Sequence, residues 1–220
     1  MITDYSIQAI AINAIPLIFA ITIHEAAHGY AARHFGDNTA YMLGRVSLNP
    51  IKHIDPVGTI LIPLMLILAS SPFLIGYAKP VPVNFGRLRN PRIDSIWVAL
   101  AGPGSNFAQA LIWAVLLIAL IGFGVDERFL LAMSQAGITW NLVLLVFNLF
   151  PLPPLDGGRI LSSLLPARQS IAFGKLEPWG FFIVLGLVFT GIIGSFWMEP
   201  LIAFFKSIIY FMTLPLQMLF

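Results

Sequence analysis

The 220-residue chain contains no cysteine and little charge, since Lys, Arg, Asp and Glu together make up 10% of it. The absence of cysteine excludes disulfide bonds and thiolate chemistry, so any bound metal would depend on His, Asp or Glu ligands. So few charged residues cannot cover the surface of an ordinary soluble domain. Histidine and glutamate are also scarce, with four of each.

Hydrophobic residues take the place of the missing charge. They form 58% of the chain, and the mean hydropathy is +0.88. This composition predicts an integral membrane protein whose surroundings are the lipid bilayer. The basic pI of about 9.1 does not indicate a nucleic-acid partner, because the Lys and Arg residues lie in the connections between apolar segments and report topology instead.

Six apolar segments, each near the ~20 residues that a membrane span requires, are distributed along the chain. We therefore predict an all-α polytopic membrane protein with one membrane-embedded domain over residues 1–220. The catalytic core would cover about 6–160, and accessory helices about 180–219. The first residues have no basic leader region and no small-residue cleavage site, which favours a retained first span. The segments are 6–32, 57–75, 96–123, 130–151, 180–198 and 200–219.

One apolar segment carries three polar side chains, in the stretch IFAITIHEAAHGYAA at residues 18–32. In a helix, His24 and His28 share a face one turn apart and can direct their rings at one metal ion. Glu25 lies beside that face, where it can act as a general base without being a ligand. The alternative is a helix-packing role, but ionisable residues cost ~2.5–3.5 kcal/mol each within a span, which favours a metal site.

A third ligand is expected from Asp156, which lies in the stretch NLFPLPPLDGGRI. The three prolines of this stretch break the preceding helix, and the two glycines permit a tight turn. Broken helix at membrane depth is tolerated where it lines a cavity or is buried in protein. Zinc bound by two histidines and one carboxylate keeps a fourth position for a water molecule and lowers that water's pKa to ~7.

Taken together, these motifs resemble the site-2 protease family of intramembrane zinc metalloproteases, peptidase family M50. The resemblance rests on H-E-x-x-H, on N-x-x-P-x-x-x-x-D-G running from Asn148 to Gly157, and on AGPGSN at 101–106. It covers about residues 18–160, in a compact form without PDZ or CBS domains. The resemblance implies one zinc ion per chain held by His24, His28 and Asp156, with Glu25 as the catalytic base.

The same resemblance implies that Asn148 engages the substrate backbone or the oxyanion. Asn106 would contact substrate or only bridge helices, and the sequence leaves both readings open. The expected activity is a zinc metalloendopeptidase that cuts single-span membrane proteins or remnant signal peptides in a prokaryotic cell membrane. Two alternatives are a catalytically silent membrane scaffold and a different intramembrane metallopeptidase with a glutamate as third ligand. Fe²⁺ and Co²⁺ fit the same ligands as Zn²⁺.

Topology follows from the need for the two motif helices to be parallel, so that their ends meet at one metal. We therefore predict about five transmembrane helices, with 57–75 as a re-entrant segment. Most basic residues then fall on one face, which the positive-inside rule makes cytoplasmic, with the N-terminus outside and the active site towards the cytoplasm. The stretches 41–49 and 79–85 are predicted to form short edge strands near the site. The basic residues of this face are Arg33, Arg45, Lys52, Lys79, Arg87, Arg89, Arg92, Arg159, Arg168 and Lys175.

Overall fold

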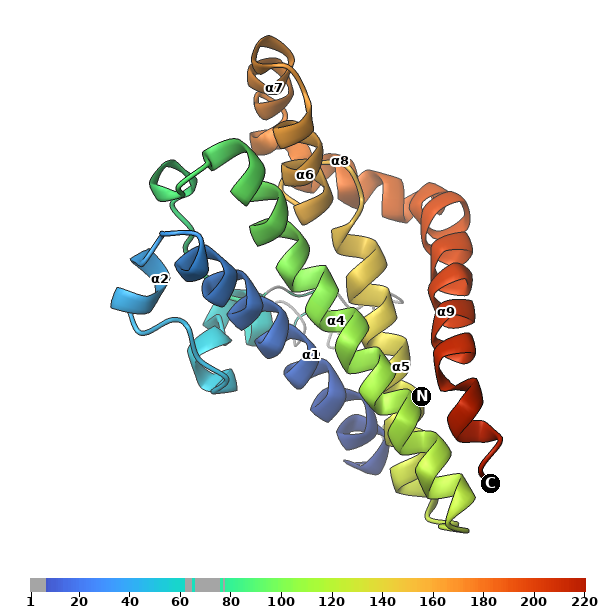
Figure 1. Cartoon of the computed structure of the whole chain (residues 1–220). Coiled ribbons are helices and arrows are strands. Elements are labelled where there is room, and N and C mark those ends of the chain that lie inside the picture. Colours follow the sequence, from blue (N-terminus) through green and yellow to red (C-terminus); the bar gives the residue numbers. More distant parts are fainter. Residues whose placement is uncertain (1–6, 62–64, 66–75, 77) are drawn as a thin grey trace.

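Three long helices form the centre of the structure, a computed structural model that describes residues 7–61, 65, 76 and 78–220. Helix α1 (Ile7–His34) and helix α5 (Arg128–Asn148) run in the same direction, and helix α4 (Pro91–Gly122) runs between them in the opposite one (Figure 1). Helix α9 (Glu199–Gln217) packs beside α4 and α5 and completes the bundle. The parallel course of α1 and α5 is the arrangement that a shared metal site requires.

The long helices are apolar around most of their circumference, as expected of helices that face lipid. Four of them are long and apolar enough to cross a membrane: Gln8–His34, Pro91–Gly122, Arg128–Asn148 and Gly194–Gln217. Only 11–33% of the most apolar stretch of each helix is buried inside the protein. The rest of this apolar surface needs a lipid surrounding, so the chain is a membrane protein.

Where these helices meet, small side chains let them approach closely. Ala110 and Ala114 of α4 pack with Leu142, Val146 and neighbouring residues of α5 in a fully buried cluster, against which α9 lies. In a membrane, such close contact replaces the hydrophobic effect as the source of helix association.

The connection between α1 and α4 begins and ends at the same end of the bundle. The backbone N–H of Arg89 donates to the carbonyl of Phe35 at 3.0 Å, and the Arg89 guanidinium donates to the carbonyl of His34 at 2.6 Å. Within this connection, the N–H of Lys79 donates to the carbonyl of His53 at 2.9 Å. The chain therefore leaves at His53 and returns to the same place at Lys79. The predicted re-entrant segment 57–75 lies largely outside the described residues, but its flanks meet as a re-entrant path requires.

Asp37 ties this connection to the end of α1. Its carboxylate is fully buried and accepts hydrogen bonds from Thr39 and from the backbone N–H of Asn84 at 2.6 Å. Burial alone would raise the pKa of Asp37, but these hydrogen bonds and the nearby Arg87 hold it below its ordinary value. The ionised carboxylate thus anchors the extended segment 78–84 beside α1.

The two short strands predicted near the site are not present among the residues that the structure describes. Residues 41–49 contain the end of helix α2 (Thr39–Met42) and a turn at Gly44, whose φ is 63°. Residues 78–84 form no strand, and their backbone contacts are isolated ones, such as that of Lys79 to His53 and that of Asn84 to Asp37. Pro80 and Pro82 have no N–H to donate to a neighbouring strand, and the N–H of Val81 between them is bonded to a side chain. The prediction from β-forming residues was therefore wrong, because these prolines remove the ladder donors.

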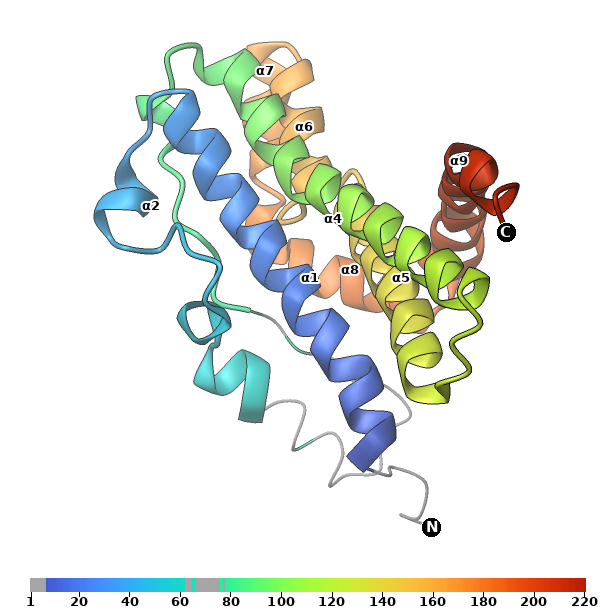
Figure 2. The ribbon, with the colours of Figure 1, turned by 60° about the horizontal axis from the view of Figure 1, so that its bottom comes forward.

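The remaining short helices connect the main ones. Between α2 and α4 lie the 3-10 helices η1 (Pro50–His53) and η3 (Phe85–Arg87) and the π-helix η2 (Pro56–Leu61). After α5 come α6 (Asp156–Leu164), α7 (Ala167–Gly174), α8 (Glu177–Phe189) and the π-helix η4 (Gly194–Met198). Figure 2 shows that the α4–α5 turn lies at the end of the bundle opposite to α6 and α7.

The predicted span at 180–198 differs from the structure. Helix α8 has 13 residues, is bent by 67° from α7, and leads from α6 and α7 across to the start of α9 (Figure 1). Gly191, with φ of 75°, follows the end of α8 and breaks the helix although apolar residues continue beyond it, so 180–198 does not form one straight helix. The described part of the chain thus has four candidate spans, with a fifth only if the bent α7–α8 pair is counted as one.

The absence of native cysteine allows the topology to be tested by single-cysteine labelling in intact cells. Cysteines at Asn38, Arg89 and Arg168 should react only with a reagent that reaches the cytoplasmic face, because all three positions lie at the end of the bundle that carries the basic connections. A cysteine at Asp126, in the turn between α4 and α5, should show the opposite labelling. Labelling of position 89 from outside, with position 38 labelled from the cytoplasm, would contradict the antiparallel course of α1 and α4.

Candidate metal centre

Helix α1 supplies two imidazoles to one point. His24 and His28 lie one turn apart on the face that packs against α4, and their Nε2 atoms are 3.1 Å apart. His24 is 6% exposed. The approach of α4 depends on Gly102, where an added Cβ would lie 2.4 Å from His28 Nε2 and 2.6 Å from His24 Nε2. The glycine therefore leaves open the space into which both rings point.

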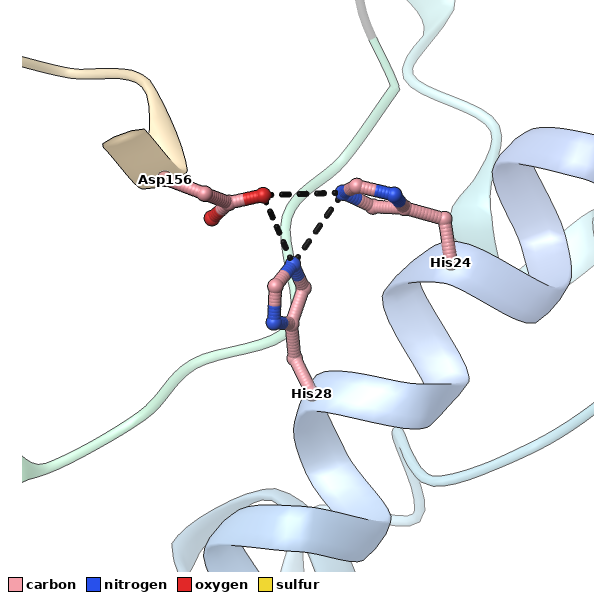
Figure 3. A group of neighbouring side chains, drawn as sticks. All are labelled: His24, His28 and Asp156. Carbon is pink, nitrogen blue, oxygen red and sulfur yellow. Dashed lines mark hydrogen bonds and ion pairs between the residues drawn. The ribbon is translucent and has the colours of Figure 1, made fainter. Parts of the chain in front are cut away.

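Asp156 enters the same space from the other side. It is the first residue of α6, directly after the proline-rich break that follows α5. Gly157 and Gly158 let α6 fold back against this break, since a Cβ on Gly157 would lie 2.1 Å from the carbonyl oxygen of Leu149. The Oδ2 atom of Asp156 is 3.3 Å from His24 Nε2 and 3.4 Å from His28 Nε2 (Figure 3).

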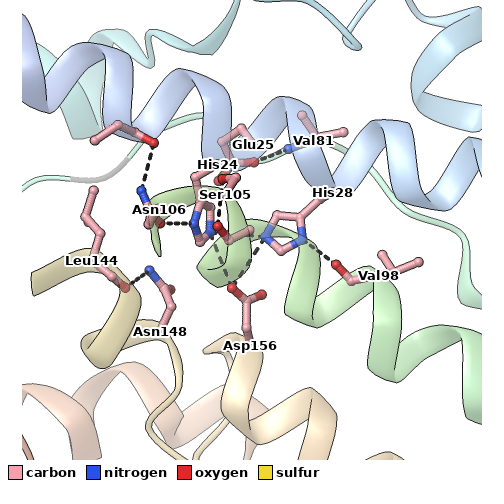
Figure 4. Close-up of polar contacts among 12 residues, drawn as sticks. His24, Glu25, His28, Val81, Val98, Ser105, Asn106, Leu144, Asn148 and Asp156 are labelled. Carbon is pink, nitrogen blue, oxygen red and sulfur yellow. Dashed lines mark hydrogen bonds and ion pairs between the residues drawn. The ribbon is translucent and has the colours of Figure 1, made fainter. Parts of the chain in front are cut away.

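In each imidazole, the hydrogen-bond partner of Nδ1 determines whether Nδ1 or Nε2 carries the proton. His28 Nδ1 lies 2.7 Å from the carbonyl oxygen of Val98, which can only accept a hydrogen bond. His24 Nδ1 lies 2.6 Å from Oδ1 of Asn106 (Figure 4). Both Nδ1 atoms therefore carry a proton, and in the neutral rings both Nε2 atoms present a lone pair to the centre.

In the neutral rings, three lone pairs thus converge at the centre. The Oδ2 atom of Asp156 is buried and receives no hydrogen bond. Such an arrangement is unfavourable unless a cation lies among the three atoms. Ligand atoms of a tetrahedral zinc site, with bonds of about 2.0–2.1 Å, lie about 3.3 Å apart. The observed spacings of 3.1–3.4 Å match this value. The residues therefore fit a zinc ion, and the described residues contain no other cluster of three such ligands.

Glu25 lies next to the three converging side chains without joining them. Its Oε2 atom accepts a hydrogen bond of 2.7 Å from the backbone N–H of Val81, in the extended segment 78–84 (Figure 4). This contact fixes one carboxylate oxygen, and no hydrogen bond to the second is found within residues 7–61 and 78–220. The segment that the sequence predicted as an edge strand thus positions the predicted base through a single N–H group.

The two asparagines expected at the site occupy different positions. Asn148 is the last residue of α5, is half-buried, and donates to the carbonyl of Leu144 at 3.0 Å. Figure 4 shows it beside Asp156 on the same side of the site. Asn106 is fully buried and contacts His24 rather than an open surface. Its position favours a role in orienting the ring over contact with substrate.

Two residues of the site were not predicted to act there. The carbonyl of Val98 orients His28, and no side-chain pattern reveals a carbonyl contact. Asn141 of α5 accepts a hydrogen bond from Asn106 and donates one to the carbonyl of Gly137. It is a polar residue in an apolar helix, seven positions before Asn148, and this spacing was the available signal.

Comparisons with known proteins agree with the geometry. The model of peptidase family M50 matches residues 130–191. YwhC of Bacillus subtilis (strain 168) is 40% identical over 203 residues, which cover 90% of this chain and 89% of that protein. Rip2 of Mycolicibacterium smegmatis is 30% identical over 192 residues, which cover 86% of this chain and 70% of that protein. The names of both relatives describe them as zinc metalloproteases. No solved structure matches the chain.

The chain therefore belongs to peptidase family M50, the site-2 protease family. It is a membrane metalloprotease, and this membership confirms the resemblance that the H-E-x-x-H and N-x-x-P-x-x-x-x-D-G motifs indicate.

Two glycines of α4 provide a matched test of the space at the centre. Gly102→Ala places a methyl group against both Nε2 atoms, so we expect zinc binding to weaken by at least about tenfold. Gly104→Ala, on the same helix with no atom within 4 Å of its Cβ, should bind zinc like the unmodified chain. Zinc retention by the purified variants, measured against a competing chelator, distinguishes them. Equal retention by the two variants would contradict the proposed position of the metal.

Proposed function

We propose that the chain is an intramembrane zinc endopeptidase. It would cut peptide bonds within or near the transmembrane segments of single-span membrane proteins or remnant signal peptides. His24, His28 and Asp156 would hold one zinc ion per chain, because their Nε2 and Oδ2 atoms converge with the spacing of zinc ligands and Oδ2 receives no hydrogen bond. This convergence is the observation that carries the proposal.

Each residue of the site has a separate part in this chemistry. The bound zinc would supply an activated water and polarise the peptide carbonyl. Glu25 would accept the proton of that water with its free oxygen, while the N–H of Val81 keeps the carboxylate in place. Asn148, at the end of α5 beside Asp156, would donate to the substrate backbone or the developing oxyanion.

The depth of the site supports an intramembrane substrate. At 1.5 Å per residue, His28 lies about 8 Å and His24 about 14 Å along α1 from Arg33, the first basic residue at that end of the helix. A peptide bond that reaches this depth belongs to a membrane-embedded segment. The backbone carbonyls of a helical segment are hydrogen-bonded internally, so the substrate would have to unwind before hydrolysis.

The orientation of the chain follows from its charges. With the ends of α1 and α5 towards the cytoplasm, the basic connections obey the positive-inside rule, and the N-terminus lies outside. We place the protein in a prokaryotic cell membrane with its site open to cytoplasmic water. The extended segment 78–84, whose N–H at Val81 contacts Glu25, would line the route from the cytoplasm to the site.

The roles of the acidic residues can be separated experimentally. Glu25→Gln should retain zinc but lose at least about 10²-fold in the cleavage rate, because the amide cannot accept the proton. Asp156→Ala should lose zinc, because one of three protein ligands is removed. Metal content is measured on purified protein, and cleavage on a panel of single-span substrates in the same membranes.

A variant of an acid outside the site serves as the control. Glu177→Gln, at the start of α8, should leave both metal content and cleavage unchanged. Undiminished cleavage by Glu25→Gln would remove Glu25 from the mechanism. Unchanged zinc content in Asp156→Ala would require a different third ligand.

A further inference from the structure

Asn141 lies fully buried in α5, and neither of its hydrogen-bond partners is a proposed metal ligand. Burying an unpaired amide in a membrane is costly, so its partners are informative. Its Nδ2 atom donates to the carbonyl of Gly137 at 2.9 Å. Its Oδ1 atom accepts from Nδ2 of Asn106 at 3.0 Å.

These contacts leave one orientation for each amide. The carbonyl of Gly137 can only accept, so Nδ2 of Asn141 must face it, and Oδ1 must face Asn106. Asn106 must then present its Nδ2 atom to Asn141. The same Nδ2 atom also donates to the carbonyl of Ala20 at 3.2 Å. Both hydrogens of the Asn106 amide are therefore engaged, and its Oδ1 is left for His24 Nδ1 at 2.6 Å.

The two imidazoles differ in how their tautomers are set. His28 depends on one backbone carbonyl, that of Val98, whose direction is fixed by helix α4. His24 depends on a side-chain amide that could rotate by 180°. A rotated amide would point hydrogens at His24 Nδ1, which favours the tautomer with the proton on Nε2. That proton would occupy the lone pair that faces the proposed zinc ion.

Asn141 resists this rotation. A flipped Asn106 would set oxygen against the Oδ1 atom of Asn141 and against the carbonyl of Ala20. Without Asn141, only the longer contact to Ala20, at 3.2 Å, would hold the amide. The chain of contacts runs from Gly137 through Asn141 and Asn106 to His24, across the α4–α5 and α1–α4 interfaces.

We propose that Asn141 is a positioning residue that acts through Asn106 to keep the Nε2 atom of His24 free for metal. This inference rests on the proposed zinc site. It assigns to α5 a contribution beyond carrying Asn148 and leading the chain to Asp156. It also predicts that the effect of Asn141 on metal affinity disappears when Asn106 is absent.

A double-mutant cycle on the full-length chain tests this coupling. Zinc affinity is measured by chelator competition for the unmodified chain, Asn106→Leu, Asn141→Leu and the double variant. We expect Asn106→Leu to weaken zinc binding by about 10–100-fold and Asn141→Leu by about tenfold. The double variant should bind zinc as Asn106→Leu does. If the two effects multiplied instead, Asn141 would act by general loosening of the bundle, and the proposal would fail.

Two further variants distinguish the proposed effect from a general loss of folding. Asn141→Ser keeps a donor for the carbonyl of Gly137, as Ser134 does for that of Leu130 on the same helix, but is too short to reach Asn106. It should lose zinc affinity as Asn141→Leu does. Ser134→Ala removes a buried polar group of α5 two turns away and should bind zinc like the unmodified chain. Unmodified affinity in Asn141→Ser would overturn the proposal.

A spectroscopic measurement on metal-free protein separates this inference from the zinc site itself. With ¹⁵N-labelled histidine at pH 8, the His24 signals of the unmodified chain should report the tautomer with the proton on Nδ1. Asn141→Ser should shift His24, but not His28, towards the other tautomer. Identical His24 signals in the two proteins would overturn the proposal. Failure of the unmodified chain to bind zinc, with the tautomer shift observed, would instead overturn the proposed function.

Discussion

Three side-chain atoms, on His24, His28 and Asp156, meet inside a membrane protein within 3.1–3.4 Å of one another, and the helices around them hold them there. Their mutual repulsion is tolerable only around a cation. The residues around the three side chains are arranged as a cation site requires. Gly102 leaves the space open, and the Nδ1 partners of both rings direct the lone pairs inward.

The need to bring these three side chains to one point also explains the course of the chain. The histidines lie near one end of α1, and Asp156 follows the same end of α5, so these two helices must be parallel (Figure 1). Helix α4 runs back between them and contributes a glycine, a carbonyl and an asparagine to the site. The connection from α1 to α4 returns to its starting end, and on the way its extended segment reaches Glu25 through the N–H of Val81.

The sequence was sufficient for features that depend on local spacing or on rare polar residues in apolar segments. Such features are the i, i+4 spacing of the two histidines, the position of Asp156 after the prolines, and the parallel course of α1 and α5. Features that depend on the approach of two elements were not predictable. The strands predicted at 41–49 and 79–85 are absent from the described residues: the first stretch contains the end of α2 and a turn at Gly44, and in the second the N–H of Val81, between Pro80 and Pro82, is bonded to Glu25. The span predicted at 180–198 is instead the 13-residue helix α8 followed by a break at Gly191, because hydropathy does not record the positive φ of this glycine. The role of Asn141 required knowledge of its neighbour across the interface.

Zinc-edge X-ray absorption on the purified chain tests the central claim most directly. The account predicts one zinc ion per chain, surrounded by nitrogen and oxygen atoms at about 2.0–2.1 Å, with outer-shell scattering from two imidazoles. Loss of one imidazole contribution in His28→Ala would identify that ring. A chain that takes up no zinc, or a metal whose surroundings contain no imidazole, would contradict the assignment of His24, His28 and Asp156 as the metal centre.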